Sequence, residues 1–193
     1  MPSTGQQVGE AARDRHDSGF RPAGAGDGRI SRGQQMKSNS VDHATFVVER
    51  MLPGRPPHAF RFWSEFDLKR KWTSCHPDWT VLEDSFGFRI GGSEAARWRT
   101  AEGEMRGFRA HYFDIVPGER IIYAYEMTLG ARRLSASLAT VVFTADGAQT
   151  RMTFTEQAAV LDADAGIDAR ASGTGSGFER LAAVMEQEQS PLH

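Results

Sequence analysis

The residue pair with the most evident chemistry is Cys75-His76, a thiol beside an imidazole that could act as its base. Cys75 is the only cysteine among 193 residues, so an intramolecular disulfide is excluded. A nucleophilic cysteine needs a base that hydrogen-bonds its sulfur, and adjacent side chains rarely orient in that way. No flanking catalytic signature accompanies the pair, and no Ser-His-Asp context is recognisable. The sequence therefore predicts no nucleophilic active site of these types.

Residues that could hold a metal ion are present, but their spacing does not match a known site. His58, His76 and His111 do not show the spacing of zinc ligands. The acidic run from Asp162 to Asp168 is similar to a calcium loop, but it lacks the acid at its fifth position and the closing glutamate. A solvated loop is the favoured interpretation of this run. No metal and no cofactor is predicted.

Glu156 is the strongest single candidate for a functional residue. Side chains alternate between the two faces of a strand, so Met152, Phe154 and Glu156 share one face of the predicted strand over Thr150–Val160. A carboxylate on that apolar face would act as a hydrogen-bonding anchor or a proton acceptor. The favoured alternative is a salt bridge with a nearby arginine, because structural networks also place carboxylates in such settings.

The neighbouring strands extend this apolar face. On Ile121–Leu129, Tyr123, Tyr125 and Met127 share one side, opposite small or polar residues. Core packing is one explanation of such periodicity, and a ligand cavity is the other. The tyrosines favour the cavity, since a buried hydroxyl needs a partner that a ligand or water can supply. With side chains from the helices and two tryptophans at the rim, the candidate ligand-binding residues are Trp63, Trp72, Trp98, Tyr123, Tyr125, Met127, Met152, Phe154, Glu156, Phe178, Leu181 and Met185.

Apolar periodicity predicts the elements that position these residues. The strands are expected at Ala44–Leu52, Trp79–Phe86, Phe88–Ile90, Ala95–Thr100, Met105–Val116, Arg120–Leu129, Arg133–Phe143 and Thr150–Val160. Pro117-Gly118 predicts a tight turn between two of them, and Asp146-Gly147 predicts a hairpin. Hairpin-connected strands form an antiparallel sheet.

Three helices are expected around this sheet. The first carries an apolar stripe at Ala59, Phe62, Trp63 and Phe66, and the second is a short helix over Leu68–Trp72 that Asp67 caps. Ser176 and Glu179 have the spacing of a capping box and predict the start of the last helix there. Its stripe of Phe178, Leu181, Ala182 and Met185 must cover the apolar face of the sheet. The fold class is therefore α+β.

Composition sets the remaining bounds. Hydrophobic residues make up 39% of the chain, a low share that points to a disordered portion. Residues 1–40 are poor in large apolar side chains, so we expect a disordered N-terminal extension there and a folded domain over residues 41–189. The net charge of −2 argues against nucleic acid or an anionic membrane as partner. Without a membrane-spanning run or a secretory signal, the expected compartment is the cytoplasm.

The motifs FRIGG, FDIVPGERIIYAYEM, LSASLATVVF, RMTFTEQ and GSGFERL, in this order, resemble the START-like (SRPBCC) superfamily. Within it, the chain is most similar to the branch named after the activator of Hsp90 ATPase homologue 1. The resemblance covers about Val41 to Gln187 and implies a helix-grip fold, a curved antiparallel sheet wrapped around a long C-terminal helix. It also implies a hydrophobic cavity between the sheet and that helix.

The predicted function is that of a protein that binds a small hydrophobic or aromatic molecule in this cavity. Two alternatives remain open. One is an enzyme similar to the cyclases and aromatases of the superfamily, which use the same cavity, although no catalytic motif supports it. The other is an interaction module of the Hsp90 co-chaperone type. The oligomeric state also stays open, with a homodimer as one candidate.

Overall fold

One antiparallel sheet dominates the computed structural model, which describes residues 41–73, 78–162 and 166–189. Within them the strands are β1 (Asp42–Leu52), β2 (Thr80–Phe86), β3 (Ser93–Arg99), β4 (Met105–Val116), β5 (Arg120–Leu129), β6 (Arg132–Asp146) and β7 (Gln149–Val160). Their order in the sheet is β1-β7-β6-β5-β4-β3-β2, so β1 adds to β7 and every other neighbour is a hairpin partner. The described residues lie in one compact unit.

Glycines with a positive φ form the two hairpin turns that the sequence predicts. Gly118 has a φ of 75° between β4 and β5, a conformation that glycine adopts without steric cost. The Glu119 N–H donates to the carbonyl of Val116 at 3.0 Å and closes this turn. Gly147 has a φ of 61° between β6 and β7. The two predicted turns are therefore present.

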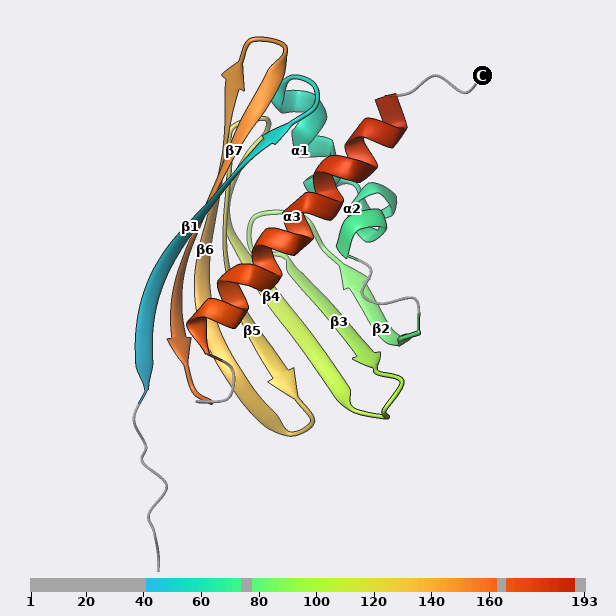
Figure 1. Cartoon of the computed structure of the whole chain (residues 1–193), viewed down its shortest axis with the longest axis vertical. Helices are drawn as coiled ribbons and strands as arrows, with labels where there is room; N and C mark the ends of the chain where they lie inside the picture. The colour runs from blue at the N-terminus through green and yellow to red at the C-terminus, as the bar shows by residue number, and fades with distance from the viewer. Residues whose placement is uncertain (1–40, 74–77, 163–165, 190–193) are drawn as a thin grey trace, which may run out of the picture. The chain divides into compact units, whose positions relative to one another are not determined.

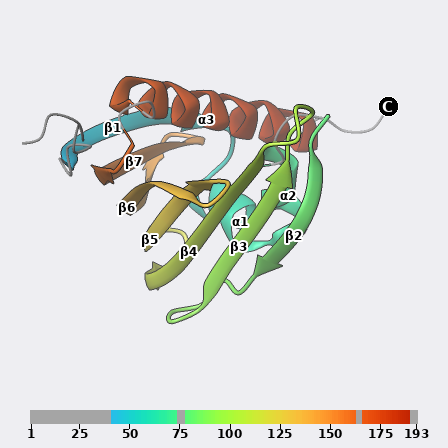
Figure 2. The ribbon, with the colours of Figure 1, turned by 90° about the horizontal axis from the view of Figure 1, so that it is seen from below.

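In the described part of the chain, three helices lie on one face of the curved sheet: α1 (Pro56–Ser64), α2 (Phe66–Thr73) and α3 (Ile167–Gln189). Figure 1 shows α3 running diagonally across the strands, and Figure 2 shows α1 and α2 on the same face. Pro56 and Pro57 begin α1, where a missing N–H costs little. The seven strands and the long last helix form the helix-grip arrangement that the sequence predicts.

The hydrophobic core lies where α1 and α3 meet the sheet. Its fully or almost fully buried side chains include Leu52, Phe62, Ile121, Met152, Leu181 and Met185. Trp63 stands at the centre of the aromatic part, with ring centroids 5.0 Å from Trp72 and 6.0 Å from Phe178. The apolar stripe of α3 and the inward faces of β5 and β7 therefore meet as their periodicity indicates. The stripe predicted for the first helix holds up to Trp63, but Phe66 belongs to the next helix, because α1 ends at Ser64.

Some predicted boundaries are wrong. Phe88–Ile90 is not a strand, because the segment turns at Gly91, whose φ is 75°. The Arg89 N–H donates to the carbonyl of Gly87 at 2.9 Å instead of to a neighbouring strand. Asp67 does not cap α2, since the helix begins one residue earlier at Phe66.

The predicted capping box is also wrong. The last helix begins at Ile167, so Ser176 and Glu179 lie inside it. Glu179 accepts a hydrogen bond from Arg50 of β1 at 2.8 Å, and Arg50 also approaches the carbonyl of Gly175. The stretch is helical although its three glycines, Gly173, Gly175 and Gly177, lower its helix propensity.

Three sequence predictions fall outside the described residues. They are the disordered extension over residues 1–40, the Cys75-His76 pair, and the middle of the acidic run from Asp162 to Asp168.

Candidate functional site

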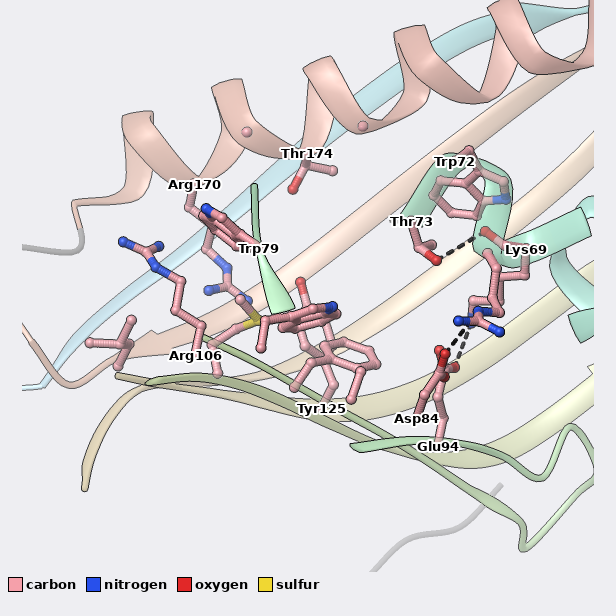
Figure 3. Close-up of a pocket in the computed structure, with 18 of the residues that line it drawn as sticks. Lys69, Trp72, Thr73, Trp79, Asp84, Glu94, Arg106, Tyr125, Arg170 and Thr174 are labelled. Atoms are coloured by element: carbon pink, nitrogen blue, oxygen red, sulfur yellow. Dashed lines mark hydrogen bonds and ion pairs between the residues drawn. The ribbon is translucent and has the colours of Figure 1, made fainter. Parts of the chain in front are cut away.

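A cavity of about 770 Å³ lies between the sheet and the helices α2 and α3. Volumes of this order are typical of small-molecule sites. Its walls are largely aromatic, with Trp63 of α1, Trp72 of α2, Phe108 of β4 and Phe178 of α3 among the lining residues. Figure 3 shows Lys69, Asp84 and Glu94 at one end, Arg106 and Arg170 at the other, and Tyr125 between them. An apolar middle thus separates two charged ends.

The structure divides the twelve candidate residues predicted from sequence into two groups. Those that line the cavity are Trp63, Trp72, Trp98, Tyr123, Tyr125, Met127, Phe154 and Phe178. The other four, Met152, Glu156, Leu181 and Met185, are fully buried and do not belong to the lining. The period of a strand or helix shows which face is apolar, but it does not show where packing stops and open volume begins.

Glu156 lies beneath the Arg170 end of the cavity at the centre of a polar network. Its carboxylate forms an ion pair with Nε of Arg170, a residue of the first turn of α3. The Tyr125 hydroxyl donates to Oε2 at 2.6 Å, and the Ser137 hydroxyl donates to Oε1 at 2.8 Å. Arg170 also donates to Ser135 at 2.6 Å. The salt bridge with an arginine, the favoured interpretation of Glu156, is therefore present.

The register of the sheet brings this network together. Tyr125 of β5 is directly opposite Ser137 of β6, and Glu156 of β7 is opposite Ala139, two residues further along β6. All three side chains share the face that α3 covers. Arg170, which the sequence analysis missed, then closes the network from the helix, and its guanidinium lies 5.1 Å from the centre of the Tyr125 ring.

Burial and charge act together on the titration of these groups. Burial raises the pKa of Tyr125, so its hydroxyl stays protonated and remains a donor to Glu156. For Arg170, burial acts to lower the pKa, but Tyr125 and Glu156 outweigh it and raise the pKa. The guanidinium at this end of the cavity therefore stays charged.

A second network, which the sequence analysis also missed, lies at the other end of the cavity. Lys69 of α2 forms an ion pair with Oε2 of Glu94 on β3, and its Nζ lies 3.1 Å from the Tyr112 hydroxyl on β4. Tyr112 donates to the same Glu94 oxygen at 2.5 Å. The side chains of Lys69 and Glu94 are only 9% and 12% exposed, and both line the cavity.

Aromatic rings surround the Lys69 ammonium. Its Nζ lies 5.0 Å from the centre of the Phe86 ring and 5.8 Å from the centres of the Trp63 and Tyr112 rings. Burial lowers the pKa of Lys69, and Glu94 offsets part of that effect. Burial likewise raises the pKa of Tyr112, so its hydroxyl stays protonated beside the amine.

Among the described residues, no three His, Cys, Asp or Glu side chains come together in a way that could hold a metal ion. None of the described helices is long and apolar enough to cross a membrane.

The family described as activator of Hsp90 ATPase homolog 1-like protein matches residues 55–186, which is more than half of the chain. The chain belongs to this family. Its fold is of the START-like (SRPBCC) type, as the sequence resemblance indicates. The matched residues run from the first turn of α1 into the last part of α3, and they contain every residue that lines the cavity. The cavity is thus built entirely from the family domain.

Solved structures of bacterial proteins are similar to this family member. A putative uncharacterized protein from Rhizobium leguminosarum is 45% identical, with a TM-score of 0.73, over 77% of this chain and 97% of its own. The Mll3558 protein from Rhizobium loti is 38% identical, with a TM-score of 0.68, over 75% of this chain and 99% of its own. The CV1439 protein from Chromobacterium violaceum shares the fold at 20% identity, over 74% of this chain and 96% of its own, with a TM-score of 0.64. No curated protein matches the chain.

Proposed function

We propose that this protein binds a small hydrophobic or aromatic molecule in the cavity between the sheet and α3. The observation that carries this proposal is the cavity of about 770 Å³ with aromatic walls. Protein interiors are packed to the density of organic crystals, and cavities beyond the size of a few water molecules are rare in a filled core. The tryptophans and phenylalanines of the wall suit an apolar, planar guest.

The two ends of the cavity suggest how such a guest is oriented. Arg170 and Tyr125 present polar atoms at one end, and Lys69 and Glu94 present them at the other. The charges at both ends are paired within the protein, so the cavity does not require a charged ligand. A molecule with an aromatic body and a polar group at one edge fits this pattern, since few polar contacts orient a ligand in an apolar site.

Ala96 of β3 offers a direct test, because it lines the cavity and belongs to neither polar network. The variant Ala96→Phe places a ring in the proposed ligand volume. Titration with the neutral dye N-phenyl-1-naphthylamine should show binding to the wild-type protein and at least tenfold weaker binding to the variant. The melting temperature of Ala96→Phe should stay close to that of the wild type, because the new ring enters open volume.

The matched control is Ala139→Phe, at a fully buried position of β6 outside the cavity lining. Overpacking a filled core typically costs 1–3 kcal/mol, so this variant should lose stability. If the wild type binds no dye, or if Ala96→Phe destabilises the protein as much as Ala139→Phe does, the cavity is not a binding site. Native mass spectrometry of freshly purified protein would identify a ligand that remains bound.

A further inference from the structure

Lys69 is an unusual residue for the wall of an apolar cavity. Its side chain is 9% exposed, whereas that of Lys71, two residues later on α2, is 46% exposed and pairs with Glu188. Removing an ammonium and a carboxylate from water costs several kcal/mol, and their mutual attraction often does no more than offset that cost. Apolar side chains at both positions 69 and 94 would fill the site without this penalty. Stability alone therefore does not account for the lysine.

One partner of Lys69 is suited to proton transfer, and the other holds that partner in place. Glu94 accepts hydrogen bonds from both the Lys69 ammonium and the Tyr112 hydroxyl on one carboxylate oxygen, Oε2. It can therefore take a proton from the ammonium and leave a neutral amine. Tyr112 keeps its proton because it is buried, and its hydroxyl lies 3.1 Å from Nζ. An amine and a carboxylate that can accept and return its proton thus meet at the cavity wall, and the buried Tyr112 hydroxyl holds that carboxylate in place.

We propose that Lys69 is a nucleophilic amine that forms an imine with the carbonyl carbon of an aromatic aldehyde or ketone held in the cavity. This inference rests on the proposed function, since the cavity must first bind the ligand. Desolvated lysines beside aromatic side chains are the type that reacts in this way, because burial favours the neutral amine. The ligand class is therefore a carbonyl compound with an apolar, ring-containing body.

The step balances without an oxidant or a reductant. Glu94 takes a proton from the Lys69 ammonium, and the nitrogen of the resulting neutral amine adds to the carbonyl carbon. The former carbonyl oxygen takes this proton from Glu94, and Glu94 then carries a second proton from the nitrogen to the same oxygen. The hydroxyl group leaves as water, whose two hydrogens are the two that the ammonium gives up, and the product is a protonated imine. A protonated imine would lie among the rings of Phe86, Trp63 and Tyr112, at distances suited to cation–π attraction.

The test uses 2-naphthaldehyde as the probe, with sodium cyanoborohydride to reduce any imine to a stable amine. Peptide mapping by mass spectrometry then locates the label. Lys69 should be labelled at least tenfold faster than Lys71, and the labelling of Lys69 should retain its rate at lower pH than that of Lys71. Excess N-phenyl-1-naphthylamine should protect Lys69 and leave Lys71 unchanged. Lys69→Arg should abolish the fast label, whereas Lys71→Arg should retain it.

Tyr112→Phe adds a measurement that a purely structural role would not change. It removes the hydrogen bond that Tyr112 donates to Glu94, the group that transfers the protons, so it should slow the labelling of Lys69 at least tenfold while the dye affinity stays within about twofold. Labelling of Lys71 or the terminal amine at the same rate as Lys69 in the wild-type protein would overturn the proposal, and this comparison needs no variant to fold. If the dye binds normally and Lys69 is not labelled, the imine inference fails while the proposed function stands. If the dye does not bind, the proposed function fails first.

Discussion

Glu156→Gln should be far more disruptive than its nearly isosteric shape suggests. The carboxylate of Glu156 is fully buried and accepts hydrogen bonds from Arg170, Tyr125 and Ser137. A glutamine offers one acceptor oxygen and turns an NH₂ group towards the remaining donors. It also leaves the Arg170 guanidinium, 12% exposed, without its counter-charge.

The size of the effect follows from this geometry. Removing one partner of a buried ion pair typically costs 3–5 kcal/mol. For a chain of this length, a change of 1 kcal/mol shifts the melting temperature by roughly 2–4 °C. Glu156→Gln should therefore melt about 6–20 °C below the wild type, and urea unfolding should show a lower midpoint with an unchanged slope.

Glu126→Gln on β5 is the matched control. Glu126 pairs with Arg133 at 2.6 Å, but the two side chains are 30% and 59% exposed, so water screens the pair. Exposed pairs contribute about 0–1 kcal/mol, and this variant should unfold close to the wild-type midpoint. The double variant Glu156→Gln/Arg170→Met should be less destabilised than the sum of its single changes by about 1 kcal/mol or more. A Glu156→Gln protein as stable as Glu126→Gln would refute this account of the buried network.

Three further outcomes follow from burial. Leu181→Ala should lower the free energy of unfolding in urea by about 2–5 kcal/mol. Leu138→Ala, at a position 40% exposed, should lower it by about 0.5 kcal/mol or less. Equal effects would show that α3 does not pack as described. Deletion from Gly175 onward removes Phe178, Leu181 and Met185 from the core and should yield insoluble or molten protein; a soluble, cooperatively folding product would contradict the helix-grip packing. All three tyrosines have a raised pKa because they are buried. The folded state therefore keeps protons that the unfolded chain loses above pH about 10. The free energy of unfolding should fall as the pH rises through that value. Phenolate absorbance at 295 nm should rise over the same pH range in which circular dichroism shows the protein unfolding. A tyrosine that ionises near pH 10 in the folded protein would contradict this expectation.

The sheet could be predicted where alternation and turn chemistry agree. The bounds of β4 and β5 match the prediction because Pro117-Gly118 ends one apolar run and begins the next. The start of α3 could not be predicted in this way. Ser176 and Glu179 have the local spacing of a capping box, but Glu179 is engaged by Arg50, 129 positions away in the chain. A capping motif is a local signal, and the helix instead begins at Ile167, where Arg170 of its first turn pairs with the buried Glu156.

The site shows the same limit more clearly. The two-residue period of β7 was enough to place Glu156 inside, but Arg170 lies before Ser176, where the sequence predicted the last helix to begin. Lys69 did leave a signal, because it lies three residues after Phe66 and three before Trp72, on the buried side of α2. A lysine on an apolar stripe must find a buried counter-charge. Sequence alone could not have shown that Glu94 of β3 supplies it, since the pairing depends on how α2 packs over the sheet. A charged residue that interrupts an apolar stripe is therefore a sequence signal for a polar site, and only the fold identifies its partner.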